Sequence, residues 1–358
     1  MSRVYNFNPG PSTLPLEVLE QIRDELLDFN HSGMSILESS HRGKEYSAVH
    51  TEAEQNLRKL LNVPDDYAIL FLTGGASAQF AMVPMNLLRK GRFAEYVHTG
   101  AWAKKAIAEA RIVGEVRISA DTSAEKPARI PRIDELNLHD DAEYVHITSN
   151  ETIDGIQWKV FPRTKAPLVA DMSSDILSRP FDLKQFGLIY AGAQKNLGVA
   201  GVTVVIIRKD LAERVPDSVP KIFRYRSHIE ENSLFNTPPC FAVYILMLMT
   251  RWIMKTGLDV IYKQNREKAA ILYKVIDADG FYRGTAHPES RSDMNVTFRL
   301  ADESLTELFI KEASEAGFKG LKGHRTVGGI RASIYNAFPV QGVKALADFM
   351  CEFRRKHG

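Results

Sequence analysis

The stretch LIYAGAQKNLGVAGVTVVII, residues 188–207, contains two apolar runs separated by small residues and a single lysine. Short runs that are apolar throughout are typical of strands buried on both faces of a sheet. Gly198 and Gly201 favour a tight turn between the two strands, with Lys195 on that turn. A buried ammonium is costly to desolvate, and one productive use of such an amine is a Schiff base to a carbonyl compound. The alternative is a lysine at a strand end with its charged head in water.

Length and composition indicate a globular protein of about two domains. The chain has 358 residues, of which 44% are hydrophobic and 25% charged, with a net charge of +2. This charge gives no electrostatic argument for binding nucleic acid or a membrane surface. The two cysteines, Cys240 and Cys351, lie too far apart for a disulfide framework or a metal-ligand spacing. We therefore expect no metal and a reducing, cytoplasmic environment.

The chain offers no obvious membrane or secretion signal. Its first residues, MSRVYNFNPGPS, lack the apolar core of a signal peptide. The longest apolar stretch, residues 241–249, is much shorter than the ~20 residues that span a bilayer. We interpret that stretch as a buried or interface helix.

Helical and strand-like patterns alternate through the first two thirds of the chain, which predicts an α/β fold with a mostly parallel sheet covered by helices. The helical patterns cover residues 15–29, 45–61, 79–88 and 102–110. The strand-like runs are residues 67–72, 94–97, 144–147, 168–170, 188–191 and 202–207.

The last third predicts a smaller α+β domain. An irregular segment, 216–239, precedes the apolar helix, for which we predict Thr237 as the N-cap. A helix over 258–276 then leads to strands at 294–300 and 330–334 and to helices at 305–316 and 340–355. We expect three parts: an N-terminal segment (1–15), a large domain (16–257) and a small C-terminal domain (258–358).

Four features follow predicted strands, at the edge where open α/β sheets bind ligands. The loop 73–79, TGGASAQ, offers small residues and free N–H groups to an anion, although plain strand–helix turns look similar. Asp171 ends a buried strand and suits a cationic ring nitrogen, or it caps a turn. Trp102 could stack on an aromatic cofactor or belong to the core. Thr152 could bond a phenolic oxygen or serve an ordinary turn.

Together with Lys195, these features favour pyridoxal 5′-phosphate as the cofactor, because they supply an amine, a pyridine partner, a stacking face and a phosphate cup. At this point the chain resembles the phosphoserine aminotransferases, which are class V aminotransferases of fold type I. The resemblance covers nearly the whole chain and rests on NFNPGP (6–11), SHRGKE (40–45), NETIDG (150–155), GAQKN (192–196), FNTPP (235–239) and GHRTVGGIRAS (323–333).

The resemblance implies a role for each matching residue. Lys195 carries the internal aldimine, Asp171 pairs with the pyridine nitrogen, and Trp102 stacks on the ring. Thr152 and Gln194 contact the ring substituents. The N-terminal segment, 1–15, lies near the active site. The phosphate would be bound by Ala76 and Ser77 of one subunit and by Asn236 and Thr237 of the neighbouring subunit, so a homodimer with shared active sites is expected.

The implied substrates are anionic at both ends, and arginine binds carboxylate or phosphate bidentately. Arg331 is the candidate for the α-carboxylate. The distal phosphate, or the side-chain carboxylate of glutamate, would be bound by His324 and Arg325 and by His41 and Arg42, and the resemblance places His41 and Arg42 across the dimer interface. Without the cofactor motifs, these two His-Arg pairs are typical of basic solvated turns.

The implied reaction is ping-pong amino transfer from L-glutamate to 3-phosphohydroxypyruvate, giving O-phospho-L-serine and 2-oxoglutarate in serine biosynthesis. The family also aminates a phosphorylated hydroxythreonine precursor in pyridoxine biosynthesis. Two positions differ from some members: Ser77 stands where they have arginine, and Pro9 where they have serine. The alternatives are an alanine–glyoxylate type aminotransferase, a cysteine desulfurase, for which neither cysteine is well placed, and a non-catalytic pyridoxal phosphate binding module.

Overall fold

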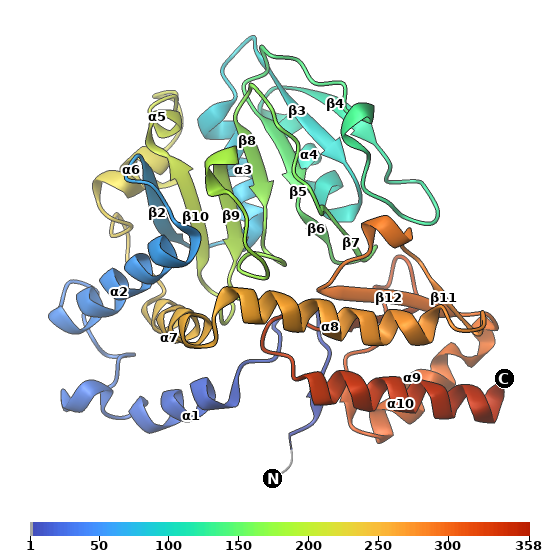
Figure 1. Ribbon diagram of the computed structural model, residues 1–358. Coiled ribbons are helices and arrows are strands. Elements are labelled where there is room, and N and C mark those ends of the chain that lie inside the picture. Colours follow the sequence, from blue (N-terminus) through green and yellow to red (C-terminus); the bar gives the residue numbers. More distant parts are fainter. Residues whose placement is uncertain (1–2) are drawn as a thin grey trace.

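The computed structural model describes residues 3–358 and is built around a seven-stranded sheet (Figure 1). The strand order is β2-β10-β9-β8-β5-β3-β4. The bounds are β2 (Tyr67–Leu72), β3 (Phe93–His98), β4 (Glu115–Asp121), β5 (Val145–Thr148), β8 (Leu168–Asp171), β9 (Phe186–Gly192) and β10 (Thr203–Arg208).

The mostly parallel sheet is confirmed, and its exception lies beside Lys195. From β4 to β9 each neighbouring pair is parallel, whereas β10 runs antiparallel to both β9 and β2. Thr203 pairs with Gly192, and the N–H of Ala193 donates to the carbonyl of Val202 at 3.0 Å. The connection between the strands therefore spans residues 193–202 and is wider than the predicted tight turn.

Helices cover both faces of this sheet because its strands are apolar on both sides. In β2, Ile69 and Phe71 join one hydrophobic cluster, while Leu70 and Leu72 join the cluster on the opposite face. The first cluster includes α2 (Lys44–Leu61) and the buried helix α7 (Cys240–Thr256), and the second includes α3 (Gly75–Leu87) and α4 (Ala101–Val113). The remaining helices of this region are α1 (Leu16–Glu25), α5 (Lys209–Ala212) and α6 (Tyr225–Glu230).

Three local predictions need correction. Helix α3 begins at Gly75, four residues before the predicted start, so Ala76 and Ser77 lie in its first turn. Thr237 is not an N-cap: α7 begins at Cys240 after Pro239, because a residue that precedes a proline is disfavoured in the helical region. Strand β4 was not predicted because this edge strand alternates between exposed and partly buried residues and contains no continuous apolar run.

The last part of the chain forms a separate hydrophobic cluster around a three-stranded antiparallel sheet, β11-β12-β14. Phe7 of the N-terminal segment is fully buried in that cluster, and β1 (Tyr5–Asn6) pairs in parallel with β13 (Phe318–Lys319). The other elements are α8 (Leu258–Ile276), β11 (Tyr282–Gly284), β12 (Asn295–Leu300), α9 (Thr306–Glu315), β14 (Ile330–Ser333) and α10 (Val340–His357), together with the small hairpin β6 (Asn150–Glu151) and β7 (Ile156–Gln157).

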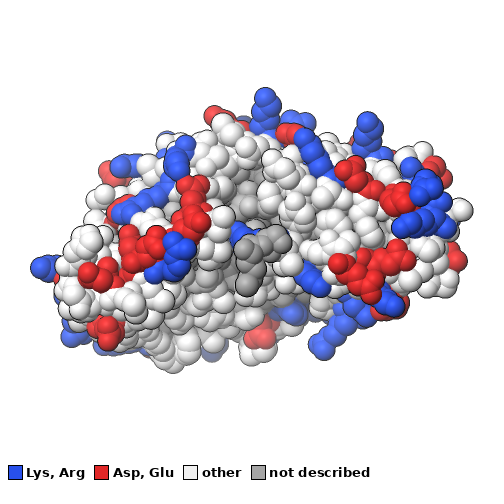
Figure 2. Space-filling view, turned by 90° about the horizontal axis from the view of Figure 1, so that it is seen from below, with Lys and Arg blue, Asp and Glu red and all other residues white. Residues whose placement is uncertain are grey.

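Figure 2 shows positive and negative side chains interspersed on either side of a hollowed central region. Within residues 3–358, no single helix is long and apolar enough to cross a bilayer. Helices α7 and α8 reach that length and apolarity only as a pair, and they meet at an angle of 87°. Met1 and Ser2 of the predicted 1–15 segment lie outside the described residues.

Candidate active site

A cavity of about 470 Å³ lies at the carboxyl ends of the parallel strands. Asp171 is the last residue of β8, Lys195 follows β9, and Trp102 follows β3. This is the edge at which open α/β sheets bind ligands. The predicted site residues that line it are Ala76, Ser77, Trp102, Thr152, Asp171, Gln194, Lys195, His324 and Arg331.

Lys195 is fixed through its backbone, and its surroundings lower the pKa of its amine. The hydroxyl of Ser12 donates to its carbonyl at 2.6 Å, and the N–H of Ser12 donates to the carbonyl of Gln194 at 3.0 Å. Burial lowers the pKa of Lys195, and the charge of Arg331 acts in the same direction, whereas Asp171 opposes it. A lowered pKa increases the share of neutral amine, which is the nucleophilic and proton-accepting form.

Asp171 is a buried carboxylate that Ser173 orients. Its Oδ1 accepts from the N–H of Ser173 at 2.9 Å, and the hydroxyl of Ser173 accepts from the N–H of Gly192 at 3.0 Å. Burial raises the pKa of Asp171, while the nearby Lys195 and the hydrogen bonds from Ser173 lower it. A cationic group in the cavity would favour the ionised carboxylate further.

Trp102 is fixed at its backbone and at its ring. Its indole N–H donates to Thr152 Oγ1 at 2.9 Å, and its backbone N–H donates to Glu151 at 3.0 Å. Glu151 also accepts from the N–H of Ala103 at 2.8 Å, so this fully buried carboxylate caps α4. Burial raises the pKa of Glu151 to about 8, although these two N–H bonds act against that rise. The Lys195 amine lies 5.6 Å from the centre of the Trp102 ring.

The loop before α3 is shaped to approach a ligand closely. Gly74 has a φ of 90°, and a Cβ there would lie 2.5 Å from the Cβ of Ala78. The N–H of Ala78 closes the first helical turn on the carbonyl of Gly74. The N–H groups of Gly75, Ala76 and Ser77 precede that turn and have no carbonyl within the helix to bond, so they can bind an anion.

Arg331 is a buried cation that forms no ion pair with a carboxylate of residues 3–358. It is 7% exposed, its Nη1 donates to the carbonyl of Thr152 at 3.3 Å, and its Nε has no hydrogen-bond partner within the described chain. The hydroxyl of Thr148, which also lines the cavity, likewise lacks a partner among the described residues. Buried polar groups are normally paired, so these two groups are available to a polar ligand in the cavity.

The cavity residues fit pyridoxal phosphate by their chemistry. They supply an amine for its carbonyl, a carboxylate for its ring nitrogen, an indole for its ring and backbone N–H groups for its phosphate. Sequence reasoning missed the orienting roles of Glu151 and Ser173 and the unpaired hydroxyl of Thr148. Their signal is position, because each lies at the carboxyl end of a parallel strand or within three residues after it.

Five predicted residues do not line this cavity in the single chain. His41 and Arg42 lie just before α2, and Asn236 lines a different pocket, which has Gly74 in common with the cavity. Thr237 and Arg325 are exposed. Four of the five, all except Arg325, are residues that the resemblance assigns to the neighbouring subunit's site.

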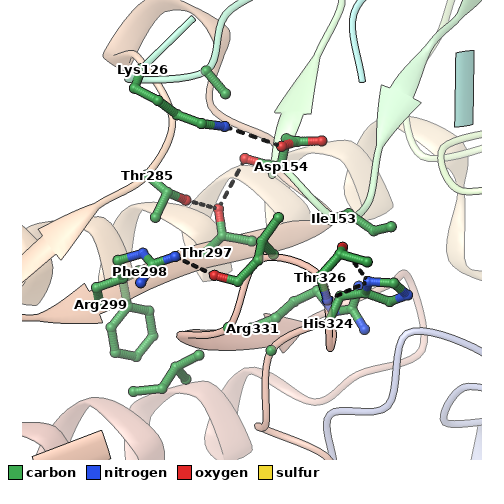
Figure 3. A pocket seen from close by; sticks show the side chains of 15 residues that line it. Lys126, Ile153, Asp154, Thr285, Thr297, Phe298, Arg299, His324, Thr326 and Arg331 are labelled. Atoms are coloured by element: carbon green, nitrogen blue, oxygen red, sulfur yellow. Dashed lines mark hydrogen bonds and ion pairs between the residues drawn. The ribbon is translucent and has the colours of Figure 1, made fainter. Parts of the chain in front are cut away.

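A second pocket, of about 260 Å³, adjoins the cavity and shares Ile153, His324 and Arg331 with it (Figure 3). His324 bonds Thr326 at 2.7 Å, and its pKa is lowered by burial and by nearby cations, Arg331 first among them. On the opposite wall, Lys126 lies 3.8 Å from Asp154. The second pocket thus adds polar groups of both signs beside the arginine.

Comparison with known proteins gives one consistent result. The family model described as aminotransferase class-V matches residues 4–346. The chain is 57% identical over 358 residues to the phosphoserine aminotransferase of Geobacillus kaustophilus and 54% identical over 359 residues to that of Niallia circulans. Each comparison covers 99% of both chains.

Solved structures agree over the full length. The phosphoserine aminotransferase from Bacillus circulans subsp. alkalophilus has a TM-score of 0.98 at 53% identity, covering 99% of both chains. The pyridoxal-phosphate-bound enzyme from Trichomonas vaginalis has a TM-score of 0.94 at 40% identity, covering 98% of this chain and 100% of that one. An alanine–glyoxylate aminotransferase from Nostoc shares only the fold, at 17% identity and a TM-score of 0.77.

Proposed function

The chain belongs to the class-V aminotransferases and, among them, to the phosphoserine aminotransferases, and from this membership we propose how its residues share the work of the reaction. The reaction is amino transfer from L-glutamate to 3-phosphohydroxypyruvate, giving O-phospho-L-serine and 2-oxoglutarate, with pyridoxal phosphate as cofactor, in serine biosynthesis. The observation that carries the proposal is that one cavity combines Lys195, Asp171 and an arginine without a carboxylate partner among the described residues.

The cofactor supplies a carbonyl carbon for amines and an electron sink for the carbon that loses its proton. We assign its ring nitrogen to Asp171, its ring face to Trp102 and its substituents to Thr152 and Gln194. Its phosphate falls to the first turn of α3, at Ala76 and Ser77. With Ser77 in place of arginine, the phosphate depends more on backbone N–H groups and on the partial positive charge of the helix N-terminus.

Lys195 is the catalytic residue. Its lowered pKa leaves an amine that can take the proton from the substrate Cα and return it elsewhere during amino transfer. The charge of Asp171 keeps a cationic ring nitrogen protonated, which strengthens the electron sink. Trp102 and Thr152 keep the ring plane fixed relative to that amine.

The substrate is bound at its two anionic ends. Arg331 binds the α-carboxylate common to both substrates, bidentately and away from water. The distal phosphate or carboxylate is bound by His324 and Arg325 of the same subunit and by the partner subunit's His41 and the partner subunit's Arg42. Neither Arg42 nor Arg325 forms an ion pair with a carboxylate of residues 3–358, which leaves both guanidinium groups able to bind an anion.

We propose a homodimer with two shared sites. Exposed apolar side chains in the segments 27–41 and 222–236, which contain His41 and Asn236, support it, because exposed apolar surface is found at subunit interfaces. They are Leu27, at 84% exposed, Leu37, at 59%, and Phe223, Phe235, Ile222 and Met34, at 39–41%. The apolar surface would be buried by the same contact that brings His41 and Arg42, and Asn236 and Thr237, to the neighbouring cavity.

Mixing two impaired variants tests whether the site is shared between subunits. Lys195→Ala and Arg42→Ala homodimers are each expected to be impaired, but a mixed dimer contains one site with neither defect. Unfolding and refolding the two together should restore about a quarter of wild-type activity, because half of the dimers are mixed and each has one intact site. If the mixture is no more active than the average of the two variants, each site is formed by one chain alone.

We further propose a division into an N-terminal segment (1–15), a cofactor-binding domain (16–257) and a C-terminal domain (258–358), supported by the separate hydrophobic cluster of the last part. The two free cysteines support a cytoplasmic location. A second activity, amination of the phosphorylated hydroxythreonine precursor in pyridoxine biosynthesis, requires the same two anionic contacts. Turnover of that ketone precursor with glutamate as amino donor tests it.

A further inference from the structure

Three consecutive backbone carbonyls downstream of Asp171 each accept a hydrogen bond from a different asparagine side chain. Asn196 Nδ2 donates to the carbonyl of Ile176 at 3.1 Å, Asn336 Nδ2 to that of Leu177 at 2.8 Å, and Asn265 Nδ2 to that of Ser178 at 3.1 Å. All three asparagines are at most 5% exposed. We name Asn196, Asn265 and Asn336 the amide cluster.

The amide cluster joins parts of the chain that lie far apart in sequence. Asn196 directly follows Lys195, Asn336 follows the strand β14 that contains Arg331, and Asn265 lies in α8. The asparagines also bond one another: Asn265 donates to Asn336 Oδ1 at 2.8 Å, and the backbone N–H of Asn336 donates to Asn196 Oδ1 at 3.1 Å. The cluster therefore connects the three segments that contain Asp171, Lys195 and Arg331.

The backbone held by this cluster is strained. Leu177 is fully buried and has a φ of 53°, in the left-handed region that residues with a bulky side chain rarely adopt. Such a conformation persists only where the surroundings determine it fully, and it is concentrated at functional sites. In addition, Asn265 Oδ1 is buried and has no hydrogen-bond partner within residues 3–358, which is itself unfavourable.

The hydrogen bonds of the amide cluster stabilise the fold, whereas the strained leucine and the unpaired amide oxygen oppose folding, so stability alone does not account for this arrangement. What the amide cluster provides is rigidity between groups that bind different parts of the reacting molecules. We propose that Asn196, Asn265 and Asn336 are positioning residues that fix the Asp171 segment, the Lys195 loop and the Arg331 segment relative to one another. This inference rests on the assignment of those three residues to the cofactor and the substrate carboxylate.

Its test compares Asn336→Ala with Asn86→Ala as the matched control. Asn86 is also buried, and its side-chain amide makes three hydrogen bonds, to the carbonyls of Met82 and Phe223 and from the N–H of Tyr225, against two for that of Asn336. None of the three bonds of Asn86 reaches the segments of Asp171, Lys195 or Arg331. Both variants are prepared as holoenzymes. The measurements are the thermal unfolding midpoint, the pH titration of the cofactor absorbance, and KM and kcat for both substrates.

We expect both variants to be destabilised, but only Asn336→Ala to change the site. Its absorbance titration should shift by about 0.5–1 pH unit, because the lysine and Asp171 are less well fixed. Its KM for glutamate should rise about 3- to 30-fold. Asn265→Ala likewise removes one carbonyl bond and one inter-amide bond, so it should show the same changes, and it serves if Asn336→Ala does not fold.

The inference is overturned if the variants of the amide cluster lose stability as Asn86→Ala does, while the midpoint of the absorbance titration is unchanged and both KM values stay within twofold of wild type. That outcome leaves the site assignment intact. The assignment itself fails separately if Lys195→Ala keeps the cofactor absorbance and the activity, whatever the behaviour of Asn336→Ala.

Discussion

Replacing Arg331 by methionine separates substrate binding from stability. The guanidinium is 7% exposed, has one hydrogen bond at 3.3 Å to a backbone carbonyl, and has no carboxylate partner among residues 3–358. Methionine has a similar length and no charge. The variant therefore removes the proposed contact with the α-carboxylate and leaves no unpaired charge behind.

The expected loss of activity follows from that contact. A charge-assisted hydrogen bond contributes ~1.5–3 kcal/mol, and breaking a buried ion pair costs ~3–5 kcal/mol. Loss of the bidentate pair should thus lower kcat/KM by about 150- to 5,000-fold. Glutamate and phosphohydroxypyruvate should lose about equally, because both carry the α-carboxylate.

Stability should change in the opposite direction. Burial lowers the pKa of Arg331, which indicates that the charged form is disfavoured by its surroundings. Replacing buried ion pairs by apolar side chains of similar volume is often neutral or stabilising by ~1–4 kcal/mol, and for Arg331 there is no partner charge whose attraction would be lost. The free energy of unfolding of the cofactor-free Arg331→Met protein should therefore be at least that of wild type.

The assay couples 2-oxoglutarate formation to a dehydrogenase that uses it, and unfolding is followed in denaturant. Arg283→Met is the control, because Arg283 lies in the same three-stranded sheet but is exposed. The control should keep wild-type kinetics. The reasoning is refuted if Arg331→Met loses less than about tenfold in kcat/KM, or if its activity loss is accompanied by a loss of stability of more than ~1 kcal/mol.

Three further results are expected. Gly74→Ala places a Cβ 2.5 Å from that of Ala78 at a φ of 90°, so it should cost ~1–3 kcal/mol and increase cofactor loss on dialysis, read from absorbance; unchanged retention would contradict the role of the loop. Thr152→Val removes the hydrogen bond from the Trp102 indole, so kcat/KM should fall about fivefold and tryptophan emission should shift; unchanged emission would argue against the contact. The folded pKa of Lys195 lies below its ordinary value, so the unfolded cofactor-free protein binds more protons over the alkaline range below pH 10.5. Wild-type stability should rise with pH more steeply there than that of Lys195→Met, and equal slopes in denaturant titrations would refute the shift.

The sequence predicts the sheet well because its strands are buried on both faces and are therefore apolar throughout. The runs at 67–72 and 202–207 fall within one residue of β2 and β10. Strand β4 has no such run because it lies at the sheet edge, where only some of its residues are buried. Strand β10 runs antiparallel to its neighbours, and its first residue, Thr203, pairs with Gly192 of β9 and Leu72 of β2. A local sequence pattern contains no information about such long-range pairing.

The cavity could be predicted in part. Residues that we propose as cofactor ligands because of their residue type, such as Lys195 and Asp171, are visible as unusual side chains after buried strands. Residues that act by fixing others are not visible, because Glu151 and Asn336 look like ordinary polar residues until the fold places them beside Trp102 and Leu177. The resemblance assigns some residues to the site of a second subunit. No local sequence pattern shows whether such a residue serves the site of its own chain or that of the neighbouring chain.

The most direct test of the account is the absorbance and activity of Lys195→Ala. The variant is mixed with pyridoxal phosphate, dialysed and scanned in the visible range, and its turnover of glutamate with phosphohydroxypyruvate is measured beside wild type. We expect no Lys195-dependent visible band that survives dialysis and a turnover at least about 10³-fold lower. A yellow protein with near-wild-type turnover would show that Lys195 is not the amine on which this site depends.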